Sequence, residues 1–319
     1  MKTKLLYILV STPSDVYTEQ AWVSVYSARR HHPDAEILLL TDGETVIPQP
    51  LEKLLSGVMR VPFGADVPPM KRSRLLKTGM RNYVDGDFLF IDADTVIARS
   101  LEEIDAVEAP LAACRDLHSP FAVHPHRSAT VNLCRKLDFD ASGIENYFNS
   151  GVLLVKDTPQ NRSFFRAWQK NYLEGYEKGV KPDQPSLAKT LAREGVEMAL
   201  LEDRWNCEVQ NGVRYLGDAC IVHYMVTNVG SGPQDQLFLL NRKEALLEVR
   251  QAGGITPAVA AVIENPHLGY APVTQVFAGE DLYLFRTRRY RWLRSHYKPG
   301  KWSLGEFLLK VKDHLFKKA

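Results

Sequence analysis

Short runs of Val, Ile, Leu and Phe alternate along this chain with longer stretches that are bounded by helix-capping residues or proline. The runs predict strands at 4–10, 36–41, 58–61, 88–91, 111–114, 151–155 and 221–223. The longer stretches predict helices at 16–31, 51–55, 71–83, 163–176 and 185–193. Strands that are apolar on both faces are typical of a buried parallel sheet, and short connections favour right-handed crossovers. The pattern therefore predicts an α/β fold, with a mostly parallel sheet and helices on both faces.

The second half of the chain is less regular. Asn211–Gly212 is a turn signal and predicts a small hairpin over 208–213. Thr256 followed by Pro257 predicts the start of a short helix. The size of the chain, 319 residues, accommodates one large α/β domain or two small ones. Its 45% hydrophobic and 24% charged residues are ordinary for a globular protein.

Charge is distributed unevenly along the chain, with a basic excess near its end. The formal net charge is only +2, but residues 285–319 hold eleven Lys and Arg against two acids, a net of +9, which leaves −7 for the rest. We therefore divide the chain into a domain at 1–280 and a basic, aromatic-rich helical tail at 281–319. The near-neutral total charge by itself predicts no nucleic-acid partner, and nothing else in the chain indicates a groove-reading module.

Cysteine usage and hydropathy favour the cytoplasm. The four cysteines are scattered and form no Cys-x-x-Cys pair, which argues against a zinc site or a disulfide framework. The apolar run 5–10 is too short for the core of a signal peptide, and no later stretch reaches the length of a membrane span. We therefore expect a cytoplasmic protein, whose tail would allow peripheral attachment to the inner face of the plasma membrane.

Candidate chemistry lies where the run Phe88–Ile91 meets two carboxylates, Asp92 and Asp94. Asp-x-Asp occurs three times, but 85–87 precedes a predicted strand and 138–140 lies in a polar stretch. Only the middle copy follows a buried strand, where ligands of open α/β sheets gather. Side chains two apart in an extended segment point to the same side. The pair therefore predicts a site for a divalent cation, with Mg²⁺ and Mn²⁺ favoured by oxygen ligands.

The tail has a helical pattern of its own. Ser303 and Glu306 fit a capping box. Apolar residues then recur at helical spacing: Leu304, Phe307, Leu308, Val311 and Leu315. Five arginines upstream, within 286–294, are interspersed with Tyr and Trp, aromatic types that are favoured at membrane interfaces. The apolar stripe could pack on the body of the protein, or the tail could bind an anionic membrane surface.

Taken in chain order, the residues at the strand ends resemble the GT-A glycosyltransferases, most closely glycosyltransferase family 8. That family includes the glycogenins and bacterial lipooligosaccharide galactosyltransferases. The resemblance covers about residues 4–225 and rests on seven stretches: 11–17, 32–37, 73–76, 90–95, 149–152, 183–184 and 222–224. It implies a GT-A (Rossmann-like) fold. It also implies transfer of a hexose from a nucleotide sugar, with UDP-hexose favoured, to a saccharide or lipid-linked, cell-envelope glycan.

The resemblance assigns residues to the nucleotide. Ser11, Thr12 and Tyr17 would hold the base and ribose, and Arg74 would contact the diphosphate. Tyr17 could equally be a core residue. Arg74 could instead lie on a solvated helix face, if Lys71 and Arg72 are the exposed basic residues beside it.

The resemblance also assigns the metal ligands. Asp92 and Asp94 would bind the metal, with Asp92 also near the ribose, and His223 would complete the site from a distant strand. A lone histidine is more often structural. An imidazole ligand would favour Mn²⁺ over Mg²⁺.

Five residues are implied around the transferred sugar. Asn149 and Ser150 would contact the donor, and Asp116, Asp183 and Gln184 would form the catalytic group. The segment 149–151 could instead be an ordinary turn before a strand.

One departure concerns the diphosphate. The family usually has a Lys in a Lys-Pro-Trp context after the metal-binding His, and this chain has none after His223. Backbone N–H groups of 230–232, Gly-Ser-Gly, could form an anion nest instead, or the basic tail could supply the cation.

The family implies retention of anomeric configuration. We favour a front-face mechanism with Gln184 or Asp183 beneath the anomeric carbon, because no carboxylate pair resembles that of retaining hydrolases. Two rival functions remain open. A sugar nucleotidyltransferase would need Gly and Lys in the loop 11–14, which has neither. A divergent, non-catalytic protein that binds nucleotide sugars would use a decayed version of the same site.

Overall fold

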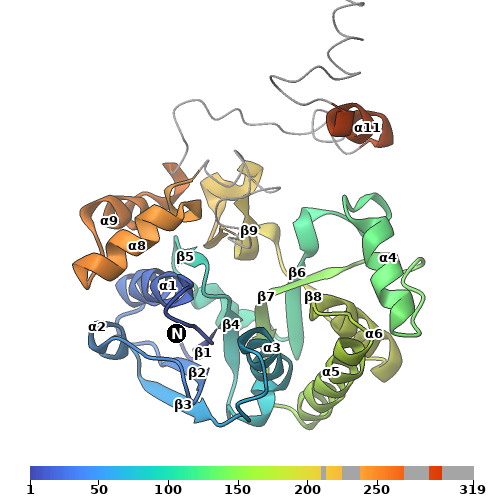
Figure 1. The fold of residues 1–319 in the computed structure, drawn as a ribbon, viewed down its shortest axis with the longest axis horizontal. Helices are drawn as coiled ribbons and strands as arrows, with labels where there is room; N and C mark the ends of the chain where they lie inside the picture. Colours follow the sequence, from blue (N-terminus) through green and yellow to red (C-terminus); the bar gives the residue numbers. More distant parts are fainter. Residues whose placement is uncertain (210–212, 225–237, 269–286, 297–319) are drawn as a thin grey trace, which may run out of the picture. The chain divides into compact units, whose positions relative to one another are not determined.

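The computed structural model describes residues 1–209, 213–224, 238–268 and 287–296 (Figure 1). They divide into two compact units, Met1–Thr274 and Gln275–Ala319. The second unit contributes one described helix, α11 (Arg288–His296). The predicted division at residue 280 falls outside the described residues and stays a prediction, as does the capping box at 303–306.

A seven-stranded sheet forms the centre of the first unit, in the order β3-β2-β1-β4-β7-β6-β8. Its strands are β1 (Lys4–Leu9), β2 (Ile37–Asp42), β3 (Gly57–Val61), β4 (Phe88–Ile91), β6 (Leu111–Arg115), β7 (Phe148–Val155) and β8 (Ala199–Leu200). Strands β1 to β4 pair in parallel, and β6 pairs in parallel with β8. Only β7 runs against its two neighbours, β4 and β6. The prediction of a mostly parallel sheet is confirmed.

Helices cover both faces of this sheet. They are α1 (Tyr17–His31), α2 (Gln49–Glu52), α3 (Pro69–Gly79), α4 (Arg127–Lys136), α5 (Pro159–Glu177), α6 (Gln184–Glu194), α8 (Lys243–Ala252) and α9 (Pro257–Glu264). Alternation along β4 separates two cores, because successive side chains point to opposite faces. Leu89 and Ile91 pack with α1 and α8, while Phe88 and Phe90 pack with α3 and α5. Figure 1 shows α3, α5 and α6 grouped apart from α1, α8 and α9.

A second sheet of three short strands brings distant segments to the end of β4. Its strands are β5 (Thr95–Ile97), β10 (Ile221–His223) and β9 (Cys207–Glu208). Strand β10 runs antiparallel to β5, with His223 opposite Thr95, and parallel to β9. The chain therefore leaves the large sheet at Ile91, passes through Asp92 and Asp94, and enters the small sheet at once.

Several local predictions need correction. Residues 149–151 lie inside the buried strand β7, so the interpretation of this segment as a turn before a strand is wrong. The apolar pattern missed the short strands β5 and β8, because two or three residues leave little periodicity. The prediction also omitted the helices α4 and α8. The turn of the predicted hairpin, 210–212, lies outside the described residues. The helix after Thr256 is confirmed as α9, and the Thr256 hydroxyl accepts the Val259 N–H as an N-cap.

In the part of the chain that the structure describes, no single helix is long and apolar enough to cross a membrane. Helices α8 and α9 pass that test only as a pair, which is bent by 116°.

Candidate active site

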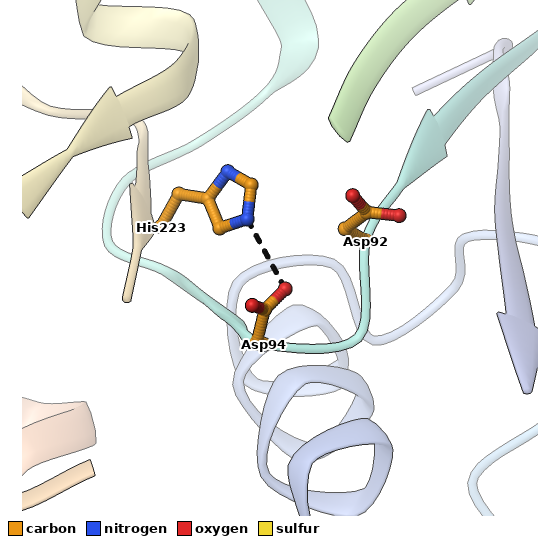
Figure 2. Close-up of side chains that lie close together, drawn as sticks. All are labelled: Asp92, Asp94 and His223. Carbon is orange, nitrogen blue, oxygen red and sulfur yellow. Dashed lines mark hydrogen bonds and ion pairs between the residues drawn. The ribbon is translucent and has the colours of Figure 1, made fainter. Parts of the chain in front are cut away.

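Two carboxylates and one imidazole converge at the end of β4. Ligand atoms of Asp92, Asp94 and His223 all lie within 4.8 Å of one another (Figure 2). The two aspartates come from the turn between β4 and β5, and His223 is the last residue of β10. Figure 2 shows the imidazole directed at Asp94, whose Oδ1 lies 3.1 Å from His223 Nε2. The predicted Asp-x-Asp pair therefore meets the predicted histidine in space.

Backbone hydrogen bonds hold this turn in place. Asp92 N–H donates to Gly151 O on β7 at 2.7 Å, and Tyr224 N–H donates to Asp94 O at 3.0 Å. The Thr95 hydroxyl donates to Asp92 O at 2.9 Å. Both aspartates are thus anchored to strands of different sheets. Such a turn can keep its carboxylates converged without relying on side-chain contacts alone.

The charges in this cluster stabilise one another. Burial disfavours the charged imidazolium, but the Asp94 carboxylate and its hydrogen bond outweigh that effect and raise the pKa of His223. Burial likewise disfavours ionised Asp94, yet His223 lowers the pKa of that carboxyl. Opposite charges at this separation each favour the ionised form of the other. The site is therefore built to hold charge in a buried position.

The donor set fits a divalent cation. Two carboxylates and one imidazole suit Mn²⁺, and carboxylate oxygens also suit Mg²⁺. Gly151 keeps the space between them open, because a Cβ there would lie 2.6 Å from His223 Cε1 and 2.9 Å from Asp92 Oδ2. Any larger residue at this position would push the ligands apart. Asp92, Asp94 and His223 would hold the ion.

The other two Asp-x-Asp copies form surface structure. Gly86, between Asp85 and Asp87, has φ 76°, and both acids pair with cations, Arg162 and Lys156. In the third copy Asp138 pairs with Lys178 at 2.5 Å. Neither copy approaches a histidine or a further acid to form a metal cluster within the described ranges. The choice of the middle copy agrees with this geometry.

Lys77 is a site residue that the sequence interpretation missed. Its Nζ lies 3.0 Å from both carboxylate oxygens of Asp92 and 3.9 Å from Asp183 Oδ2, although its side chain is only 4% exposed. The ammonium also lies 5.1 Å from the centre of the Phe90 ring. Arg74 is three residues earlier on α3, a spacing that places two residues on one helix face. That spacing was the only signal in the sequence.

Arg74 also faces the site. Its Nε lies 3.2 Å from Asp183 Oδ1, and its side chain is 35% exposed. Arg72 is buried instead, 3.2 Å from Asp42, and Lys71 pairs with Glu177. The alternative in which Lys71 and Arg72 are both exposed and Arg74 is merely solvated is therefore wrong.

Asp183 is surrounded by partners. Arg74 and Lys77 approach its two oxygens, and the Ser150 hydroxyl donates to Oδ2 at 2.7 Å. Burial opposes its ionisation, but the two cations lower the pKa of Asp183 to about 2. Asp183 is therefore a carboxylate at any physiological pH, and both of its oxygens are occupied.

Asp116 is the centre of an amide network. Its Oδ1 accepts hydrogen bonds from Asn149 Nδ2 at 2.9 Å and from Gln184 Nε2 at 2.8 Å. Its Oδ2 lies 2.8 Å from His124 Nε2. Gln184 Nε2 also donates to Phe148 O at 3.1 Å, so both hydrogens of this amide are used. The amide oxygen of Gln184 is therefore the atom left to face a ligand.

The loop after β1 has a tight structure of its own. Asp15 accepts hydrogen bonds from the Ser11 and Thr12 hydroxyls at 2.6 and 2.8 Å. Tyr17 is 45% exposed, so its interpretation as a core residue is wrong. Arg250 of α8 donates to Pro13 O and Asp15 O and binds both carboxylate oxygens of Glu19. No sequence pattern identified Arg250, since its partners are more than 200 residues away.

Two further buried residues, Asn206 and His124, were also missed. Asn206 lies between Asn149 and His223 and bonds to both. His124 bonds to Asp116, and its Nδ1 accepts the backbone N–H of His126 at 3.1 Å. The segment 225–237, which includes the anion nest predicted at 230–232, lies outside the described residues.

No family model and no curated protein matches this chain. Solved structures do match it. The bifunctional glycosyltransferase WbbM is 16% identical with a TM-score of 0.52, over 80% of this chain and 52% of that one. An active-site variant of LgtC is 15% identical with a TM-score of 0.51, over 78% of this chain and 96% of that one. The chain has the GT-A fold. The resemblance to glycosyltransferase family 8, of which LgtC is a member, is confirmed at the level of this fold.

Within the GT-A fold, the sites assigned by resemblance fall into three groups. The metal group is Asp92, Asp94 and His223, and the sugar group is Asp116, Asn149, Ser150, Asp183 and Gln184. Arg74 and Lys77 on α3 connect the two groups through Asp92 and Asp183. The third group is the nucleotide loop with Ser11, Thr12 and Tyr17. No described hydrogen bond or ion pair joins these three residues to the other two groups.

Proposed function

We propose that this protein is a metal-dependent glycosyltransferase that moves a hexose from a UDP-sugar to a saccharide or lipid-linked glycan. The observation that carries the proposal is the convergence of Asp92, Asp94 and His223 at the end of β4. In a GT-A fold this is the carboxyl end of the central parallel strands, where ligands of open α/β sheets bind. The cations beside this group would stabilise the diphosphate leaving group, and the nearby amides would contact the transferred sugar.

The leaving group is the first requirement. Breaking the anomeric C–O bond leaves negative charge on a diphosphate, and a bound Mn²⁺ or Mg²⁺ would supply Lewis-acid stabilisation of that charge. Arg74 and Lys77 stand beside the metal group and add fixed positive charge. Such preorganised charge is worth more in a buried site than in water. The two α3 cations would take over the role of the family's lysine, for which the segment 230–232 and the basic tail are the other candidates.

The anomeric carbon is the second requirement. Asp183 is held by Arg74, Lys77 and Ser150, so its carboxylate is poorly placed to act as a nucleophile. Gln184 presents a free amide oxygen, because both of its N–H groups are bonded to Asp116 and Phe148. We place that oxygen beneath the oxocarbenium-like centre. Asp183 would then orient the cations, and retention would follow from a front-face reaction.

The donor's nucleotide would lie along the loop after β1. The exposed ring of Tyr17 is available for the base, and Ser11 and Thr12 present hydroxyls and backbone groups in a loop braced by Asp15. Asn149 and Ser150, on β7, would contact the sugar side of the donor.

The test is release of UDP from a panel of nucleotide sugars. Purified protein would be incubated with each sugar and Mn²⁺, with EDTA and the Asp94→Ala variant as controls. Metal-dependent release from one UDP-hexose, with the product's anomeric configuration read by NMR, would support the proposal. Release of pyrophosphate from a nucleoside triphosphate in the presence of a sugar 1-phosphate would identify a nucleotidyltransferase instead. Binding of a UDP-sugar without turnover, after glycan acceptors have been supplied, would identify a non-catalytic binding protein.

We also propose that the basic tail, residues 285–319, attaches the enzyme to an anionic membrane surface near a lipid-linked acceptor. Its described part, α11, carries three exposed arginines, Arg288, Arg289 and Arg291. Each basic residue close to such a surface contributes roughly 1 kcal/mol, so a few of the eleven in the tail would suffice for reversible binding. This would make the enzyme cytoplasmic and peripheral to the membrane.

A further inference from the structure

A continuous chain of hydrogen bonds joins the Asp116 carboxylate to the His223 imidazole. Asn149 Nδ2 lies 2.9 Å from Asp116 Oδ1, and Asn206 Nδ2 lies 3.0 Å from Asn149 Oδ1. Asn206 Oδ1 then lies 2.9 Å from His223 Nδ1. All four residues are buried, with none more than 8% exposed. In such surroundings an unpaired or mismatched polar atom is costly, so each bond must have one donor and one acceptor.

The direction of the first bond is set by Asp116. Burial alone would raise the pKa of this carboxyl, but hydrogen bonds from His124 and the two amides lower it, so Asp116 is ionised and can only accept. The group of Asn149 that faces it must therefore be the NH₂. A second contact requires the same orientation, because the Gly151 backbone N–H donates to Asn149 Oδ1 at 2.7 Å. An acceptor on one side and a donor on the other fix this amide in one orientation.

The direction then passes from Asn149 to Asn206. Because Asn149 presents its oxygen, Asn206 must donate a hydrogen bond to it from the NH₂ group. The amide oxygen of Asn206 then faces His223. That oxygen accepts a hydrogen bond only if His223 Nδ1 carries a hydrogen. The neutral imidazole then has its lone pair on Nε2, the atom that faces Asp94 in the metal group. If the Asn206 amide were reversed, its oxygen would face the oxygen of Asn149, and its NH₂ would face His223 Nδ1–H.

We propose that Asn206 is a positioning residue that holds His223 in its Nδ1–H tautomer and so presents Nε2 to the metal. Groups that bond the second nitrogen of a metal-binding histidine determine its tautomer and its affinity for the metal. Here the direction of that bond originates at Asp116, in the sugar group, and at the backbone N–H of Gly151. The inference rests on the proposed metal site, and it adds that the sugar group and the metal group share one hydrogen-bond chain.

Two variants separate the parts of this proposal. Asn206→Leu removes both hydrogen bonds and keeps the branched shape of the side chain. Asn206→Asp keeps an acceptor for His223 Nδ1–H but loses the bond to Asn149. Asn171→Leu is the matched control, because Asn171 is also a buried amide, bonded to Thr190 between α5 and α6. If Asn206→Leu does not fold, Asn206→Ser also removes the amide and takes its place in each measurement.

The first readout is Mn²⁺ affinity, measured from the electron paramagnetic resonance signal of the free ion. We expect Asn206→Leu to weaken binding by roughly 10–100-fold, the usual effect of losing such a partner. Asn206→Asp and Asn171→Leu should stay within a few-fold of the unaltered protein. Equal Mn²⁺ affinity in Asn206→Leu and the unaltered protein, with Asp94→Ala unable to bind the ion, would overturn the proposal and leave the metal site intact.

The second readout needs no metal. The ¹⁵N spectrum of histidine-labelled protein, at a pH where the imidazole is neutral, distinguishes the two tautomers, and His223→Gln assigns the signal. We expect Nδ1–H for the unaltered protein and for Asn206→Asp, and a mixture for Asn206→Leu. An Nε2–H signal in the unaltered protein would overturn the inference. Failure of the unaltered protein to bind Mn²⁺, with UDP present, would instead overturn the metal site and the proposed function beneath it.

Discussion

Lys77 Nζ lies 3.0 Å from both carboxylate oxygens of Asp92, so a buried cation neutralises the first aspartate of the Asp-x-Asp pair. The second aspartate, Asp94, is paired with His223 at 3.1 Å. Two partly buried carboxylates separated by one residue would otherwise repel each other. Each therefore has its own positive partner before any ligand arrives. Metal binding would release a proton from His223 to solvent and free Asp94 from its partner, so we expect Asp94 to be the more direct ligand.

Removal of Asp94 tests the metal group. Asp94→Ala should lower transfer and Mn²⁺-dependent UDP binding by more than the roughly 10–100-fold that changes around a ligand cause. The fold should persist, because the backbone of the turn is held by hydrogen bonds to β7 and to Tyr224. Transfer rates and calorimetric UDP binding, each with and without Mn²⁺, provide the measurement.

The other two Asp-x-Asp copies serve as controls for this variant. Asp85→Ala removes an exposed partner of Arg162 and should leave transfer and UDP binding nearly unchanged. For the third copy Asp138→Asn is the better choice, since φ at Asp138 is 56° and Asn tolerates that conformation. Substantial Mn²⁺-dependent transfer by Asp94→Ala would show that the ion binds elsewhere.

Removal of Lys77 tests the buried cation. Lys77→Met leaves Asp92 and Asp183 close together without their shared partner, and breaking a buried pair costs about 3–5 kcal/mol. Because Asp92 is partly exposed, we expect a smaller loss in the free energy of unfolding, about 2–3 kcal/mol. Mn²⁺ should restore more thermal stability to this variant than it adds to the unaltered protein. Melting temperatures with and without Mn²⁺ measure both effects.

Lys156→Met is the matched control for that experiment. Lys156 pairs with Asp87 at 3.3 Å at the surface, in the first Asp-x-Asp copy, so its loss should change stability little and leave the Mn²⁺ response unaltered. An equal Mn²⁺ response in Lys77→Met and Lys156→Met would show that Lys77 does not share its charge with the metal group.

Gln184 tests the reacting centre. Gln184→Ala should lower kcat by about 10²–10³-fold, the effect of removing one preorganised polar group, with a smaller change in the donor KM. The reason is that its free amide oxygen is expected to act mainly in the transition state. Steady-state kinetics with the active UDP-sugar distinguish the two parameters. A pure KM effect would place Gln184 in ground-state binding of the donor.

Arg250 tests the nucleotide loop. It binds Glu19 through two bonds of 2.7 Å each and also holds the carbonyls of Pro13 and Asp15. Arg250→Gln should loosen the loop and weaken donor binding by about 1–2 kcal/mol. The donor KM should therefore rise roughly 5–30-fold, with kcat little changed. Arg30→Gln, which loses a 3.5 Å exposed pair between α1 and α9, is the control. Similar donor KM values for the two variants would argue against a role for Arg250 in the loop.

The tail is tested by truncation after Leu284. The shortened protein should still bind UDP-sugar and should no longer co-sediment with vesicles of anionic lipid at low salt. The full chain should bind such vesicles and be released as the salt concentration rises, because attraction between surface charges is screened. If the full chain does not co-sediment with the vesicles, or if truncation unfolds the first unit, the tail has a structural role and the membrane proposal is wrong.

Local sequence patterns predicted six of the seven strands of the large sheet and placed Asp92 and Asp94 at the end of one of them. Apolar runs such as Phe88–Ile91 must be buried on both faces, and a buried strand followed by two acids leaves few places for those acids to lie. Ser11, Arg74, Asn149 and Gln184 could be singled out only because their local motifs resemble a known family. Strand positions and the faces of their side chains can be predicted locally, because they depend on neighbours within a few residues.

Tertiary structure alone decided which side chains meet. Lys77 pairs with Asp92, Asn206 with Asn149 and Arg250 with Glu19 only because crossovers and strand order bring separate segments together. Asn206 lies 57 positions from Asn149, and Arg250 lies 231 positions from Glu19. Hydrophobic periodicity specifies which face of an element is buried, but it does not specify the partner that covers that face. The hydrogen bonding of the His223 imidazole is the clearest case, because His223 ends a chain of four buried side chains whose donors and acceptors must alternate.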